Sequence, residues 1–309
     1  MQSLRSLYTP IGRVVNSYNA FLHKNYPKLY DLQTAIVHGT KKTFSDSRDY
    51  AIASSRYVQG KPLEYRLAVV RWQYPRDLLK LSPVLALLLI PFSSIALLPL
   101  VYFFPGMFTR HFWTEDERKR FVARKVRRRL SVVEPELLPF ISRSIEKLEK
   151  RQEQELMWYA VGRVKEGAVL TAEEVRDMEP IFTRYPFARE HLPNDVVWNL
   201  AWLNNTLPWS LRRFCVHLSE MDKLLERNGL AQLTVPEVRH AVLIRCGNGN
   251  AEVEDMRNFL QLWIKASNSL ADPVVSLRLF LPVFLCYKHP LNREVLVPSN
   301  SSTKVRLRS

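Results

Sequence analysis

One segment of the chain concentrates charge of a single sign. Between Arg118 and Arg129, eight of twelve residues are lysine or arginine. Anionic lipid attracts such a cluster with about 1 kcal/mol per charge near the surface, and the phosphates of nucleic acid attract the same side chains. A solvated helix without a dedicated partner is the third interpretation. The candidate binding residues are Arg118, Lys119, Arg120, Arg124, Lys125, Arg127, Arg128 and Arg129.

Residues at catalytic or metal-binding spacings are not found in the sequence. There is no GxxxxGK(S/T) phosphate loop, no GxGxxG fingerprint, no HExxH zinc motif and no GxSxG nucleophile elbow. The seven histidines are scattered, and Glu252, Glu254 and Asp255 lack the spacing of a calcium loop. The three cysteines form no CxxC pair and are expected to be small buried residues. We therefore expect a protein that is not an enzyme, with no cofactor, no metal and no small-molecule substrate.

Local signals place the basic cluster on a helix. Thr114 and Glu117 have the T-x-x-E spacing of a capping box, so a helix should begin at about Glu115. Acidic residues in the first turn also suit the positive end of the helix dipole. Phe112 and Trp113, just before this helix, fit an aromatic belt at a membrane interface.

A stretch without any charged residue precedes the basic helix, from Leu81 to Thr109. In its centre, Val84–Phe104, 14 of 21 residues are Leu, Ile, Val or Phe. A membrane-spanning helix needs roughly 20 predominantly apolar residues, and this segment lacks the polar face of a soluble helix. We expect one transmembrane crossing within residues 78–109. A re-entrant hairpin and a helix buried in a large core are the alternatives.

Prolines and serines should shape that crossing. Pro83 suits the first turn of the helix, where its missing N–H is not needed. Pro91 and Pro99 fall inside and should each kink it, while Ser93 and Ser94 can satisfy a freed carbonyl in lipid. No Asp, Glu, Lys, Arg or His lies within the stretch, so the chain alone shows no path for a proton or a cation.

The excess positive charge lies on both sides of the uncharged stretch. Residues 1–80 carry a net charge of +8 and residues 110–129 of +6, whereas residues 130–309 are close to neutral. Segment 1–77 is basic and aromatic, with no acid before Asp31, which is weakly compatible with mitochondrial targeting. It is interpreted as amphipathic helices at a membrane surface or as helices packed onto the protein. Residues 110–130 form the basic juxtamembrane helix.

Residues 131–309 are predicted to form a helical bundle with a short polar tail. Capping boxes recur at Thr171/Glu174 and at Thr234/Glu237. Two apolar stripes at helical spacing are expected in the core. Their members are Leu211, Phe214, Leu218, Met221 and Leu225, and Phe259, Leu260, Trp263 and Ile264. The fold class is therefore all-α, with one proline-kinked transmembrane helix followed by the bundle.

Two motifs resemble the Letm family of mitochondrial inner-membrane proteins. The first is FPGMFTRHFWT, and the second is the pattern GxxxLTxxEVRxAxxxR from Gly229 to Arg245. The sequence is most similar to the short members of that family, which lack an EF-hand. The signature residues are Gly229, Leu233, Thr234, Glu237 and Arg245.

The resemblance implies an all-helical ribosome-binding-like domain that faces the matrix from the inner membrane. It also implies roles in cation/proton exchange, organelle shape and association with the mitochondrial ribosome. The domain is nearly neutral, which argues against direct RNA binding by that domain. The span is uncharged, which argues against ion exchange by this chain alone. Our first hypothesis is a non-catalytic membrane tether that docks the mitochondrial ribosome or one of its proteins. A component of K⁺/H⁺ exchange is the alternative; anionic lipid is an expected partner, and a homo-oligomer is left open.

Overall fold

The computed structural model describes residues 27–88, 112–272 and 275–296, and a few positions between 17 and 25. These residues form helices and connections, with no strand among them, which confirms the all-α class. The chain divides into two compact units, residues 1–121 and 122–309. The first unit contains α2 (Pro27–Val58), α3 (Tyr65–Leu88) and the start of α5 (Glu115–Leu130).

The second unit continues from the end of α5 through short helices. In chain order they are η3 (Val133–Leu137), α6 (Leu138–Ile145), α7 (Arg151–Glu166), α8 (Ala172–Met178), η4 (Glu179–Thr183), η5 (Arg189–His191), α9 (Asn194–Leu203), η6 (Pro208–Ser210), α10 (Leu211–Asn228), η7 (Leu230–Gln232), α11 (Val235–Ile244), α12 (Val253–Asn268), α13 (Leu277–Leu285), η8 (Pro290–Asn292) and α14 (Arg293–Leu296).

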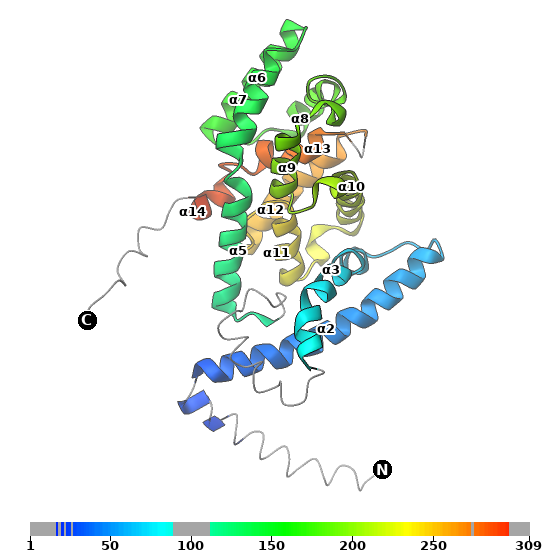
Figure 1. The fold of residues 1–309 in the computed structure, drawn as a ribbon, viewed down its shortest axis with the longest axis vertical. Helices are drawn as coiled ribbons and strands as arrows, with labels where there is room; N and C mark the ends of the chain where they lie inside the picture. Colours follow the sequence, from blue (N-terminus) through cyan, green and yellow to red (C-terminus); the bar gives the residue numbers. More distant parts are fainter. Residues whose placement is uncertain are drawn as a thin grey trace, which may run out of the picture. The chain divides into compact units, whose positions relative to one another are not determined.

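The first unit is built on the pair α2 and α3, which pack against each other (Figure 1). Small residues let the two helices approach closely, because Ala53 and Ala68 are both buried in this unit. Tyr50 stacks on Tyr74 across the pair, with ring centroids 5.0 Å apart. The helical character expected for this part of the sequence is confirmed, whereas its contact with a membrane surface stays a prediction.

Helix α3 corrects the expected position of Pro83 in the first turn of a helix. It runs without a break from Tyr65 to Leu88, so Pro83 lies inside a helix that began much earlier and does not start one. None of the helices that the structure describes is both long enough and apolar enough to cross a bilayer. Most of the predicted span falls in residues 89–111, outside the described residues, and with it the expected kink residues Pro91, Ser93, Ser94 and Pro99.

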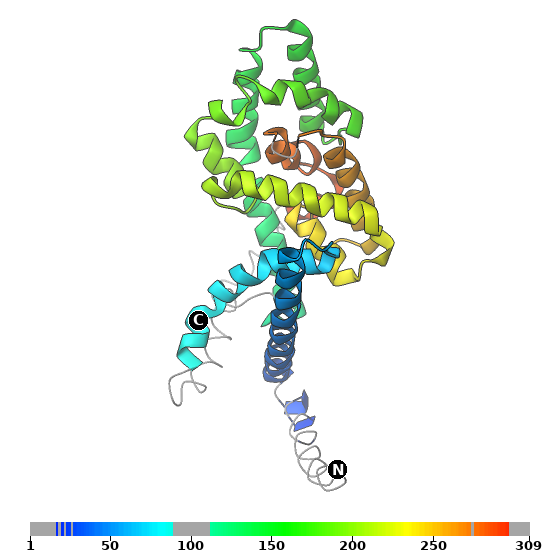
Figure 2. The ribbon, with the colours of Figure 1, turned by 90° about the vertical axis from the view of Figure 1, so that its right-hand side faces the viewer.

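The second unit surrounds α13. All nine residues of this helix are buried, and eight of them are apolar, the exception being Arg278. The rings of Phe280 and Phe284 pack on Phe182, with centroids 5.4 and 6.2 Å apart. Helices α10 and α12 both contact α13, and Figure 2 shows α10 along its full length beside them. The central helix of the bundle is therefore one that the sequence analysis did not single out.

Several local predictions for the second unit are confirmed. All members of the two apolar stripes, on α10 and α12, are buried. In the capping box of α8, Thr171 N–H donates to the Glu174 carboxylate at 2.6 Å, and Glu174 N–H donates to the Thr171 hydroxyl at 3.2 Å. The three cysteines are free and buried, as expected: Cys215, Cys246 and Cys286.

Candidate functional site

The basic helix α5 begins where its capping box predicts. The backbone N–H of Thr114 donates to the carboxylate of Glu117 at 3.0 Å, and the N–H of Glu117 donates to the Thr114 hydroxyl at 3.4 Å. Two N–H groups that have no partner within the helix are thereby satisfied. From Glu115 the helix continues unbroken to Leu130, so all the predicted basic residues share one rigid element.

Helix α5 has a buried face and a cationic face. Val122, Val126, Arg129 and Leu130 are buried and stand at positions i, i+4, i+7 and i+8. Four exposed arginines repeat the same spacing two residues earlier, on a face rotated by about 200° from the buried one. We call this set the arginine face; its members are Arg120, Arg124, Arg127 and Arg128.

Arg129 does not belong to the exposed basic surface, which corrects the sequence-based set. Its side chain is buried, and its guanidinium donates to the carbonyls of Leu203, Leu243 and Ile244 at 2.7, 2.5 and 2.9 Å. These carbonyls end α9 and α11, where backbone acceptors lack partners within the helix and a positive charge is favourable. Arg129 therefore closes two helix ends in the core and is not available to lipid or ribosome.

The other basic residues of the set divide between local contacts and the surface. Arg118 pairs with Glu115 at 2.7 Å, and Arg120 Nε donates to the Asp116 carbonyl at 3.3 Å. Lys119 is exposed, whereas Lys125 is only half-exposed. Acidic residues of the first turn thus moderate the charge at the start of α5, and the cationic surface is strongest in its second half.

Trp202 holds the end of α5 from the outside. Its indole N–H donates to the carbonyl of Arg128 at 2.8 Å, and the Arg128 guanidinium lies 4.8 Å from the centre of the Trp202 ring. Such a cation–π contact contributes roughly 0.5–1 kcal/mol at an exposed site. Together with Arg129 on the inside, it fixes the last turn of α5 to the bundle.

Four of the five family-signature residues lie at the corner between α10 and α11. Gly229 ends α10 with a φ of 76°, a backbone conformation that favours glycine. Leu233 is buried next to it, and the carboxylate of Glu237 accepts from the Thr234 N–H at 2.8 Å and from its hydroxyl at 2.7 Å. The signature therefore builds a turn.

Arg245, the last signature residue, forms a fully buried ion pair. Its Nε and Nη2 donate to Oδ1 of Asp222 at 2.9 and 2.5 Å, and its Nη1 donates to the Ala241 carbonyl. The other carboxylate oxygen of Asp222 accepts from the indole of Trp263 at 3.2 Å. Hydrogen bonds on both partners offset the cost of burying the charges. The network connects α10, α11 and α12.

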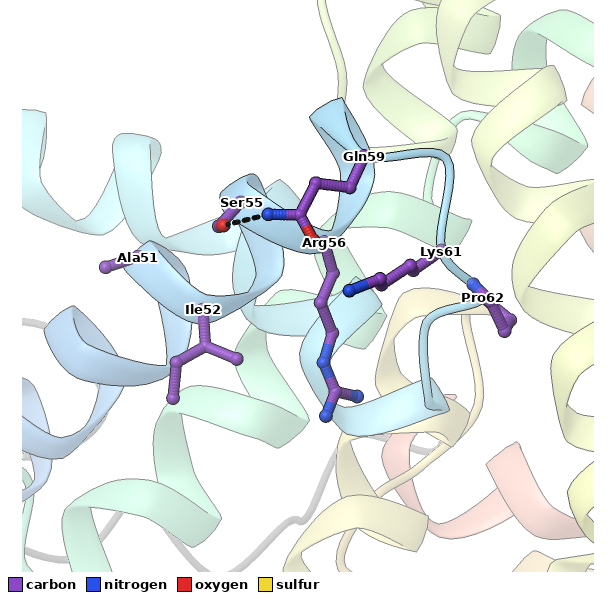
Figure 3. Close-up of a pocket in the computed structure, with 7 residues that line it drawn as sticks. All are labelled: Ala51, Ile52, Ser55, Arg56, Gln59, Lys61 and Pro62. Carbon is purple, nitrogen blue, oxygen red and sulfur yellow. Dashed lines mark hydrogen bonds between the residues drawn. The ribbon is translucent and has the colours of Figure 1, made fainter.

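A hollow of about 640 Å³ lies in the first unit, along α2 and the connection to α3. In Figure 3 the side chain of Lys61 points toward Arg56, and the amide of Gln59 donates to the Ser55 hydroxyl at 3.2 Å. Arg56 also faces Glu64 at 3.9 Å. Of the residues that line the hollow, two are cationic, Arg56 and Lys61.

Within the described ranges, no three His, Cys, Asp or Glu side chains gather as metal ligands. The thiols are also held back from chemistry: burial raises the pKa of Cys215 to about 12 and raises the pKa of Cys286 as well. Cys286 donates its S–H to the Arg245 carbonyl at 2.9 Å. Because a thiolate is the reactive form, these cysteines act as core residues.

Sequence reasoning missed a group of exposed tryptophans next to α5. Trp198 and Trp202 stand four residues apart on α9, with 58% and 46% of their surface exposed, and Trp209 in η6 is 71% exposed. Leu207, just before η6, is half exposed. The sequence did contain a signal for this group. The segment from Val196 to Ser219 has no acidic residue and contains three of the seven tryptophans.

Fold and site together define a class of protein: an all-α chain that presents a cationic helix fixed to a helical bundle. Residues 63–284 match the family model described as "LETM1-like, RBD", and the chain belongs to that family. It is 27% identical to LETM1 domain-containing protein 1 of Xenopus tropicalis over 92% of this chain and 85% of the relative. The human protein of the same name is 24% identical, with 92% and 83% covered.

A further relative is a longer protein. The mitochondrial proton/calcium exchanger protein of Drosophila melanogaster is 22% identical over 91% of this chain, which covers 28% of the relative. No solved structure matches the chain. The printed name of this relative places that protein in the mitochondrion.

Proposed function

We propose that this chain is a non-catalytic protein of the mitochondrial inner membrane whose helical domain faces the matrix and docks a partner assembly. The mitochondrial ribosome is the first candidate for that assembly, because the matching family model describes a ribosome-binding-like domain. In this role the protein would support mitochondrial organisation and respiratory function. The arginine face of α5 holds the domain to anionic headgroups.

One observation carries the proposal: the arginine face points outward from a helix that the bundle fixes at its end. Arg129 anchors that end from inside through three carbonyls, and Trp202 packs on Arg128 outside. Four outward charges on one helix offer a polyanion a stripe whose backbone is already formed, so no loop has to become ordered on binding. The uncharged stretch Leu81–Thr109 lies just before this helix in the sequence.

Membrane attachment is tested by extraction of mitochondria with alkaline carbonate. The proposal expects the chain to stay with the membrane pellet, as a membrane-spanning protein does. Release into the supernatant would contradict the inner-membrane part of the proposal.

Docking is tested with the full chain reconstituted in nanodiscs and incubated with purified mitochondrial ribosomes. The discs should sediment with the ribosomes, and discs without the chain should not. Proximity labelling from the C-terminus in intact mitochondria identifies the partner, and labelling of proteins outside the matrix would contradict the proposed orientation.

Cation exchange is the second candidate function, and the Drosophila relative named as a proton/calcium exchanger favours it. Several copies or a partner chain would have to build the path, because the uncharged stretch has no Asp, Glu, Lys, Arg or His. The purified chain in liposomes should then exchange K⁺ for H⁺. A flat signal removes exchange by this chain alone and leaves docking as the function.

A further inference from the structure

The exposed tryptophans beside α5 form a surface of their own. We call it the tryptophan face; its members are Trp198, Trp202, Leu207 and Trp209. Trp198 and Trp202 share one side of α9, and η6 packs against α9 and brings Trp209 with it. Large aromatic side chains on a protein surface mark a contact with a partner or with a membrane.

The segment that carries this face has basic but no acidic residues. From Val196 to Ser219 the chain has no acidic residue, and the nearest ones in sequence are Asp195 and Glu220. Residues 130–309 contain 22 acidic residues in all, and none of them falls in this segment. Arg212 and Arg213 are exposed directly after η6. The segment itself therefore combines apolar rings with positive charge, while Asp195 is exposed on α9 three residues before Trp198.

The tryptophan face is continuous with the arginine face of α5. Arg128 belongs to the arginine face and stacks on the ring of Trp202, so the two surfaces meet at this pair. Arginines at i, i+4, i+7 and i+8 form a stripe along the helix, and a flat surface contacts all of them only when the helix lies parallel to it. The same flat surface would meet Trp202 at the end of the stripe.

We infer that the tryptophan face lies in the headgroup region of an anionic phospholipid bilayer, so that the bundle rests on the membrane through α9 and η6. Tryptophan rings favour this region, since one end is apolar and the other wet. Arginine keeps its charge among phosphates while its stem covers apolar surface. The charge complementarity selects anionic over zwitterionic lipid. The inference rests on the proposed membrane location and adds which side of the domain faces the lipid.

The test uses the full chain in nanodiscs of phosphatidylcholine with one-fifth cardiolipin, with and without bromine on the upper acyl chain. Bromine quenches tryptophan emission only within a short distance. We expect Trp198→Phe and Trp209→Phe each to lose part of the bromine-dependent quenching of the wild-type chain. Trp158→Phe is the matched control, because Trp158 on α7 is similarly exposed, at 43%. It should retain that quenching.

A second variant tests the charge without removing a ring. Arg212→Glu combined with Arg213→Glu should lower the quenching in cardiolipin discs, and raised salt should lower it in the wild-type chain. Circular dichroism of each variant must match the wild type. The inference fails if neither Trp198→Phe nor Trp209→Phe changes the quenching, or if Trp158→Phe changes it as much.

Other occupants give different outcomes. If quenching is unchanged while Trp198→Ala or Trp209→Ala weakens sedimentation with ribosomes, the face binds the ribosome and the lipid inference is wrong. Carbonate extraction keeps the two proposals apart, because a chain retained in the membrane without tryptophan quenching overturns only the inference. Quenching in a chain that carbonate releases would instead overturn the proposed anchoring.

Discussion

Arg128 and Arg129 are neighbours in α5 and meet opposite environments. Arg128 is exposed and stacks on Trp202, whereas Arg129 is buried and donates to three carbonyls at the ends of α9 and α11. Arg245 and Arg278 are buried like Arg129, and burial lowers the pKa of Arg278. Arginine therefore has two tasks in this protein. In the core it satisfies backbone and carboxylate acceptors, and on α5 it forms a surface for anions.

The largest loss of stability should come from breaking the buried ion pair between Arg245 and Asp222. We expect Arg245→Ala to destabilise the second unit by about 3–5 kcal/mol, because Asp222 would remain buried without its partner. Thermal unfolding of the full chain in a mild detergent, followed by circular dichroism, measures the change. Arg227→Ala on the exposed side of α10 is the control and should stay within about 0.5 kcal/mol of the wild type. Equal stability of both variants would contradict the core role of Arg245.

Substituting the neighbouring pair in α5 sharpens the comparison directly. Arg129→Ala should cost about 2–3 kcal/mol, since three buried carbonyls lose a charged donor. Arg128→Ala should cost about 1 kcal/mol or less, the value of an exposed cation–π contact. The same unfolding assay measures both. Similar losses at the two positions would mean that the inner and outer faces of α5 do not differ.

Charge reversal on the arginine face should change binding and leave stability unchanged. Arg124→Glu combined with Arg127→Glu removes two favourable charges, worth about 1 kcal/mol each near an anionic surface. We expect the affinity of the full chain for fluorescent cardiolipin in detergent to fall by at least roughly 30-fold. Lys223→Glu with Arg227→Glu on α10 changes the net charge equally and should have little effect. Equal losses would show that total charge, not the arginine face, binds the lipid.

The smallest effect should appear in the pH dependence of the core. Burial lowers the pKa of His289 to about 4, and its Nδ1 accepts the Leu291 N–H at 3.0 Å. The unfolded chain binds a proton near pH 6.5 while the folded one does not, so stability should fall between pH 6.5 and 4. Water screens this half-buried group, and we expect a loss of about 1 kcal/mol. His289→Asn should flatten that part of the profile; an unchanged profile would exclude His289 as its source.

Local features of the fold could be predicted from the sequence because they depend on neighbours in the chain. The capping boxes at Thr114, Thr171 and Thr234 need only a residue three positions away, and all three are present. The apolar stripe of α10 follows from helical spacing alone. Pro83 shows the limit of local signals: a proline tolerated in a first turn was placed at a helix start, yet α3 begins at Tyr65.

The candidate site could be predicted only in outline. The density of lysine and arginine between Arg118 and Arg129 identified α5, but not which side chains face outward. That distinction depends on where the ends of α9 and α11 lie. Arg129 turns inward because the Leu203 carbonyl, 74 residues away in the chain, lies within hydrogen-bond distance. The tryptophan face also escaped detection, since a tryptophan in an apolar segment looks the same whether it will be buried, like Trp263, or exposed, like Trp209.

The sequence by itself determined the all-α class, the capping boxes at Thr114, Thr171 and Thr234, the concentration of positive charge in α5 and the family, because each depends on residue types at short spacing. Tertiary packing alone decided that Arg129 turns inward while Arg128 turns outward, and that Arg245 meets Asp222 across 23 residues. It also brought Trp202 to the end of the arginine face. These contacts join groups that are far apart in the chain, so they form only when the helices pack together.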